Sequence, residues 1–139
     1  MKPVDQTIFG GYVEGQTHPV GNCFQACIAS LLNMDLDQVP HFVDQMVRLK
    51  LGRDTAQLNK WLDKYLLCYV EVYARHNPIE LDVPDDVYYL ASGPGPRGHR
   101  HAVIYRAGAL AHDPHPSREG LLSVDQVGFI AFRPRLVQS

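Results

Sequence analysis

Cys23 stands at the beginning of a run of small and apolar residues, PVGNCFQACIASLLN (residues 19–33), that predicts a helix. A thiol in the first helical turn lies near the positive end of the helix dipole and near backbone N–H groups that have no helical acceptor. Both features favour the thiolate, which is the nucleophilic form of cysteine. A free cysteine is also often a small buried residue, so position alone leaves both interpretations open.

A histidine and an acid follow in the second half of the chain, in the stretch HAVIYRAGALAHDP (residues 101–114). His101 begins one predicted strand, and Asp113 ends the next strand, after a turn at Gly108. Because the start of one antiparallel strand lies beside the end of its partner, we expect the two side chains to be neighbours. A cysteine, a histidine and a carboxylate that orients the histidine are the components of a nucleophilic triad.

These segments resemble the papain-like cysteine peptidase superfamily, and most closely its small bacterial peptidase domains that process bacteriocin leaders. The resemblance is carried by GNCFQACIASLL for the nucleophile helix, by HAVIYRAGALAHDP for the histidine strand and acid turn, and by the order Cys, His, Asp. It covers about residues 16 to 130 and implies a nucleophile helix packed on a small antiparallel sheet. It also implies a thiol hydrolase or acyl transferase that acts on an amide or peptide bond and needs no cofactor.

The same resemblance implies a glutamine before the nucleophile that donates to the oxyanion formed during acyl transfer. Gln16 lies seven positions before Cys23, one more than the usual spacing, so the loop between them would have to absorb one residue. Gln16 is therefore either this donor or a solvated loop glutamine. The backbone N–H of Cys23 would be the second donor.

Three cysteines, Cys23, Cys27 and Cys68, do not form a disulfide framework. Cys27 lies one helical turn after Cys23 among apolar neighbours, and Cys68 begins a strand, so both are expected to be structural core residues. The N-terminus has no apolar signal segment, and a chain without an export signal keeps its thiols reduced in the cytosol. We therefore expect a cytoplasmic protein.

The histidines allow two other interpretations. A zinc set could comprise Cys23, Cys27, His101 and either His112 or His115. The chain has no paired C-x2-C and no H-x3-H element, which disfavours zinc binding. His99 and His115 flank the proposed site and could contact a substrate, whereas His112 is expected to point to the opposite sheet face from Asp113. A catalytically silent binding module with the same fold is the other alternative.

Composition excludes several other classes of protein. The chain has 139 residues, of which 45% are hydrophobic and 20% charged, and a formal net charge of -2, all typical of one soluble globular domain over residues 1–139. It has no basic excess or polybasic run that would suggest a nucleic acid or a membrane surface as partner. No apolar stretch approaches the roughly 20 residues that span a bilayer.

The elements that must position these residues follow from the periodicity of the sequence. Asn22 is expected to cap the nucleophile helix, Asp37 a short helix near Pro40, and an amphipathic helix is expected within residues 52–68. Strands are predicted at residues 68–74, 86–92, 101–108, 109–113 and 128–134. The Gly/Pro-rich stretch 92–100 is either a lid or a connector. Helices followed by an antiparallel sheet predict an α+β fold, which the resemblance makes papain-like.

Overall fold

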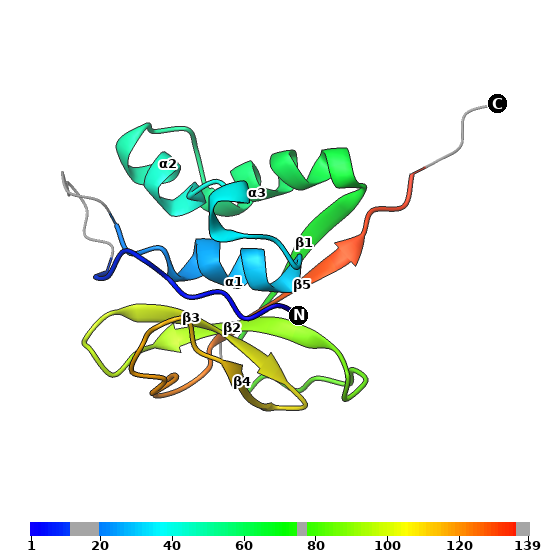
Figure 1. The fold of residues 1–139 in the computed structure, drawn as a ribbon. Coiled ribbons are helices and arrows are strands. Elements are labelled where there is room, and N and C mark those ends of the chain that lie inside the picture. The colour runs from blue at the N-terminus through cyan, green and yellow to red at the C-terminus, as the bar shows by residue number, and fades with distance from the viewer. Residues whose placement is uncertain (12–19, 75–77, 136–139) are drawn as a thin grey trace.

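The computed structural model describes residues 1–11, 20–74 and 78–135. Its helices are α1 (Cys23–Leu31), η1 (Leu36–Gln38), α2 (Phe42–Arg48), α3 (Asp54–Leu62) and η2 (Asp63–Tyr65), where η denotes a 3-10 helix. Its strands are β1 (Leu67–Tyr73), β2 (Tyr88–Pro94), β3 (Arg100–Arg106), β4 (Ala109–His112) and β5 (Gln126–Phe132). The fold is α+β with the helices first, as the sequence predicts (Figure 1).

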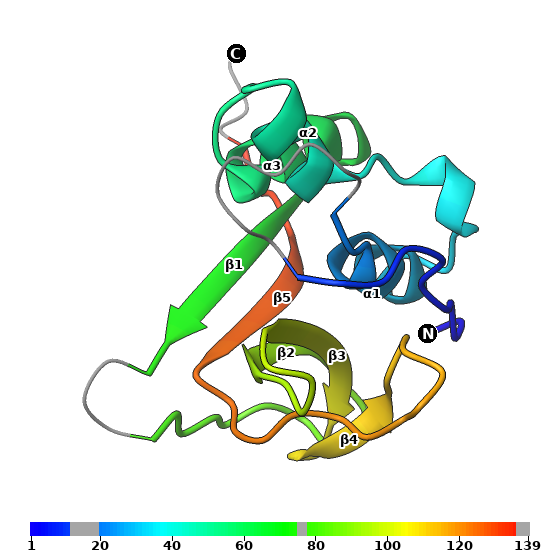
Figure 2. The same ribbon diagram turned by 90° about the vertical axis from the view of Figure 1, so that its left-hand side faces the viewer.

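The five strands form one antiparallel sheet in the order β1-β5-β2-β3-β4. The last strand of the chain, β5, is thus inserted between β1 and β2. Helix α1 packs on β3 and β2, whereas α3 packs on β1 (Figure 2). Helix α1, the predicted nucleophile helix, consequently lies over the strand that carries His101.

Helix α1 is buried on every side over residues 26–30, which are 0% exposed. A helix enclosed in this way needs cover from more than the sheet. The N-terminal segment, residues 2–8, supplies it by running alongside α1 (Figure 1). Its anchor is Ser30, whose Oγ accepts from Val4 N at 3.0 Å and donates to the Ala26 carbonyl at 3.0 Å.

Asn22 precedes α1 but does not cap it, so this prediction is wrong. Its side chain makes no bond to the helix N–H groups. Its Oδ1 accepts instead from Thr7 N at 2.9 Å and Ile8 N at 2.8 Å, and its Nδ2 donates to Gln25 Oε1 at 3.2 Å. The N-terminal segment brings two backbone donors to a side chain that is 2% exposed, and these donors take the oxygen that would have capped the helix.

Two further helix boundaries differ from the prediction. The short helix η1 begins after Asp35, which forms a capping box with Gln38, so Asp37 lies inside the helix and is not its cap. The amphipathic helix ends at Leu62 and continues only as the turn η2, after which Leu66 is left-handed with φ 58°. This residue ends the helical run before β1.

The hairpin of β3 and β4, which leads to the predicted acid Asp113, has its turn at the position that the sequence predicts. Ala107 and Gly108 occupy the turn with φ values of 51° and 74°. A β-bulge then shifts the register, so that Ile104 pairs with His112 and not with Ala111. The bulge changes the direction in which the chain leaves β4.

We expect Asn22→Ala to lower the free energy of unfolding by about 1–3 kcal/mol, because the N–H groups of Thr7 and Ile8 lose their shared acceptor in a partly buried place. Urea unfolding followed by circular dichroism measures the change. Asp37→Ala, an exposed position in η1, is the matched control and should change stability by less than about 0.5 kcal/mol. Equal losses in the two variants would contradict the role given to Asn22.

Candidate active site

His101 and Asp113 form a buried pair. His101 Nε2 lies 2.7 Å from Asp113 Oδ1, and the two residues are 3% and 1% exposed. His101 is the second residue of β3, and Asp113 directly follows β4. The predicted proximity of these side chains is confirmed.

Backbone groups hold the Asp113 carboxylate from its other sides. Its Oδ1 also accepts from His115 N at 2.9 Å, and its Oδ2 accepts from Gly120 N at 2.8 Å. Residues 113–120, the acid turn, therefore close around this one side chain. Burial by itself would raise the pKa of Asp113, but the hydrogen bonds from His101 and from the two N–H groups hold it below its ordinary value.

Cys23, in the first turn of α1, lies close enough to the same imidazole to raise its pKa. Burial would lower the pKa of His101, but the hydrogen bonds and charges of Asp113 and Cys23 outweigh it and raise this pKa to about 9. Because Asp113 occupies Nε2, Nδ1 is the nitrogen available to the thiol. Helix α1, strand β3 and the end of β4 thus bring together Cys23, His101 and Asp113, three of the four site residues that the sequence predicts.

The other two cysteines lie in different surroundings. Cys27 is fully buried, as predicted, and burial raises the pKa of its thiol well above the ordinary value. Cys68 is only half-buried, which differs from the predicted core position. Its strand β1 lies at the edge of the sheet, and Val70 and Val72 on the same strand face are 46% and 40% exposed, so little covers this face.

The remaining histidines divide between the site and the scaffold. The ring of His115 packs edge-on against His101, with centroids 6.2 Å apart, and His99 lines the cleft described below. His112 lies within hydrogen-bond distance of the Val4 carbonyl, 3.0 Å from Nε2, and so contacts the N-terminal segment. Within residues 1–11, 20–74 and 78–135, no cluster of three or more His, Cys, Asp or Glu side chains is arranged to hold a metal ion.

Gln16 lies outside the described residues, so its role as an oxyanion donor stays a prediction. Sequence analysis missed a different glutamine, Gln6, which is 6% exposed. The backbone N–H of Gln6 donates to the Pro114 carbonyl at 3.0 Å, and its side-chain Nε2 donates to the Ile8 carbonyl at 2.9 Å. Its Oε1 is buried without a partner among the described residues. No spacing in the sequence marks Gln6, because the contact arises only when the N-terminal segment folds back against the acid turn.

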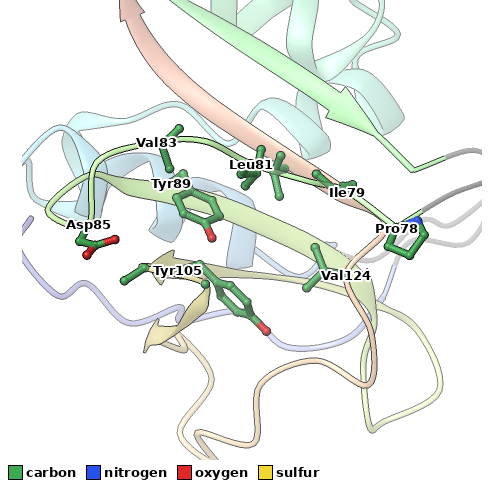
Figure 3. Close-up of a pocket in the computed structure, with 11 residues that line it drawn as sticks. Pro78, Ile79, Leu81, Val83, Asp85, Tyr89, Tyr105 and Val124 are labelled. Carbon is green, nitrogen blue, oxygen red and sulfur yellow. The ribbon is translucent and has the colours of Figure 1, made fainter.

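Two pockets lie on opposite faces of the sheet. A cleft of about 630 Å³ opens beside Cys23 and His101, between the helices and the sheet. The second pocket, of about 500 Å³, lies beneath residues 78–83 and is walled by Tyr89 and Tyr105 (Figure 3). Among the described residues that line this second pocket there is no cysteine or histidine. The cleft, in contrast, is lined by both Cys23 and His101.

No family model, curated protein or solved structure matches this chain. In the part of the chain that the structure describes, no helix combines the length and the apolar character needed to cross a membrane. The geometry of the cleft and of the Cys23, His101 and Asp113 side chains is therefore the basis for assigning a function.

The raised pKa of His101 predicts how stability depends on pH. The pKa of His101 is about 9 in the folded protein, against 6.5 for an unperturbed histidine. The interactions of the protonated imidazole therefore stabilise the fold fully below pH 6.5, and this contribution is lost as pH rises to about 9. The lowered pKa of Asp113 acts in the opposite direction, and its contribution is lost only as pH falls below 3.8. We therefore expect the stability difference between wild type and His101→Asn to shrink between pH 6.5 and pH 9, as measured by urea unfolding. A difference that stays constant over this range would contradict the raised pKa.

Proposed function

We propose that this protein is a thiol hydrolase or acyl transferase of papain-like fold that acts on an amide or peptide bond through Cys23, His101 and Asp113. The observation that carries the proposal is the buried 2.7 Å contact between His101 and Asp113, with Cys23 close enough to the imidazole to raise its pKa. A histidine–aspartate pair that served only stability would need neither a thiol beside it nor an open cleft. The order nucleophile helix, histidine strand, acid turn supports the papain-like part of the proposal.

In the first half of the proposed reaction, His101 Nδ1 takes the proton of Cys23, and the sulfur attacks the carbonyl carbon of the substrate amide. The carbonyl oxygen becomes an oxyanion, which the backbone N–H of Cys23 at the start of α1 can stabilise. Gln16 is the predicted second donor. His101 then gives its proton to the amide nitrogen as the C–N bond breaks, so that an amine leaves and a thioester remains on Cys23.

In the second half, water or an amine attacks the thioester, and His101 takes a proton from it. The bond between sulfur and carbon breaks, which releases an acid or a new amide and restores Cys23. Asp113 stays ionised throughout, keeps the Nε2 proton of His101 in place and stabilises the imidazolium. Hydrolysis and acyl transfer use the same residues and differ only in the acceptor.

We expect iodoacetamide to label Cys23 much faster than Cys27 or Cys68 near neutral pH, because only Cys23 combines a helix start with a neighbouring imidazole. Peptide mapping after limited labelling measures the three rates. Cys27 serves as the internal control for a buried thiol, and Cys68 for a half-buried thiol. Equal labelling of Cys23 and Cys68 would remove the nucleophile from the proposal.

We expect Asp113→Asn to slow the labelling of Cys23 by about 10- to 1000-fold. The amide side chain of asparagine can favour the wrong tautomer of the imidazole, and it lacks the negative charge that stabilises the imidazolium. The same change in a serine triad lowers the rate by about 10⁴. The expected loss is smaller here, because a cysteine can already be a thiolate before it reacts. The labelling rate against pH and the melting temperature are measured together.

Asp5→Asn is the matched control for this variant. Asp5 is exposed and pairs with Arg118 of the acid turn at 2.6 Å, so the control disturbs the turn but not the imidazole. We expect it to change the labelling rate by less than about twofold. A lower melting temperature of Asp113→Asn with an unchanged pH–rate curve would make Asp113 a structural residue only.

A further inference from the structure

The cleft beside Cys23 has mainly apolar walls drawn from several elements. Its apolar lining residues are Val20, Phe24, Val43, Met46, Leu90 and Ala102. Helices α1 and α2 supply one wall, and β2 and β3 the other. A volume of about 630 Å³ is in the range of sites that hold a small molecule or the side chains of a short peptide.

Two carboxylates also line this cleft. Asp54 begins α3 and Glu71 belongs to β1, and these two elements pack against each other. Asp54 Oδ1 accepts from Thr55 N at 2.9 Å, and Glu71 Oε1 accepts from Gln126 Nε2 at 2.6 Å. These donors are neutral, so they stabilise the carboxylates without cancelling their charges.

The cations near the cleft do not balance these two charges. Arg100, which lines the cleft, makes two bonds of 2.8 and 2.6 Å to Asp125, which neutralises its guanidinium. Arg53 lies close enough to the Tyr73 hydroxyl to affect the pKa of that group, but it is not among the residues that line the cleft. The described lining includes no lysine. This part of the cleft therefore favours a positively charged group.

A buried hydroxyl without a partner lies beside the two carboxylates. Tyr69 is 6% exposed, and its hydroxyl has no hydrogen-bond partner among the described residues. It lies so closely over Gly128 that a side chain there would collide with it. Gly128 pairs with Glu71 on one side and Leu90 on the other, and both of these residues line the cleft. Tyr69 belongs to the core and does not line the cleft, so its hydroxyl limits position 128 to glycine but offers no contact to a ligand.

We infer that the substrate carries an apolar chain that ends in a primary ammonium, as in a lysine side chain, and that this chain occupies the cleft beside Cys23. The methylene chain packs against Phe24, Val43 and Met46. The ammonium has three donors and no acceptor, which suits the carboxylates of Asp54 and Glu71. This inference rests on the proposed function, because it names the substrate class of the same site.

Matched peptidyl chloromethyl ketones test it, since they alkylate a nucleophilic cysteine after binding beside it. Two dipeptidyl probes are used: one has lysine at its first position and the other has lysine at its second position. Each has a control probe in which uncharged norleucine replaces the lysine. We expect at least one lysine probe to label Cys23 about 5- to 30-fold faster than its norleucine isostere. In the double variant Asp54→Asn/Glu71→Gln the preference should fall below about twofold. Each rate is divided by the iodoacetamide rate of the same protein, which removes changes in the thiol itself.

The double variant Asp82→Asn/Asp86→Asn is the matched control, because it removes the same charge from exposed positions outside the cleft and should keep the lysine preference. The single variants Asp54→Asn and Glu71→Gln replace the double variant if its melting curve shows that it does not fold. Equal rates for lysine and norleucine probes, with Cys23 still labelled by iodoacetamide faster than Cys68, would overturn this inference and leave the proposed function intact. A preference that survives in Asp54→Asn/Glu71→Gln would also overturn it. Iodoacetamide labelling of Cys23 no faster than that of Cys68 would overturn the proposed function itself.

Discussion

The buried Asp113 carboxylate is the interaction on which the site and its surroundings depend. A carboxylate removed from water costs several kcal/mol unless it is paired and hydrogen-bonded. Here His101 Nε2 and the backbone N–H groups of His115 and Gly120 meet that need together. The first partner belongs to β3 and the other two to the acid turn. This single group therefore joins the sheet to the turn, and neither can move away without leaving a buried charge unpaired.

The N-terminal segment extends this constraint to Cys23, the proposed nucleophile. Gln6 bonds to Pro114 of the acid turn, and Asn22, next to Cys23, bonds to the backbone of residues 7 and 8. The start of α1 and the acid turn are thus held by the same short stretch of chain, although they are far apart in the sequence. A triad needs its members placed to within a fraction of an ångström, and a shared support of this kind restricts their relative motion.

Features that depend on neighbouring residues could be predicted from the sequence, and features that depend on distant segments could not. The alternation in residues 68–74 and the turn at Gly108 identified β1 and the β3–β4 hairpin, and the hairpin placed Asp113 beside His101. The bulge at Ile104 left no sign in the local pattern. Asn22 has the composition of a helix cap, but the N-terminal segment recruits its oxygen, and a rule based on local spacing contains no information about that segment.

The insertion of β5 between β1 and β2 connects the scaffold to the proposed substrate preference. If β1 paired directly with β2, Glu71 would be adjacent to the strand that carries Leu90, and the cleft would be one strand narrower. In the observed order Gly128 of β5 separates these two residues. Because this position has no side chain, Tyr69 can lie across it, which brings a buried hydroxyl next to Glu71. Strand β5 also contributes Gln126, which lines the cleft and donates to Glu71 Oε1. No motif around Cys23 could reveal this arrangement, because β5 lies about 100 residues further along the chain.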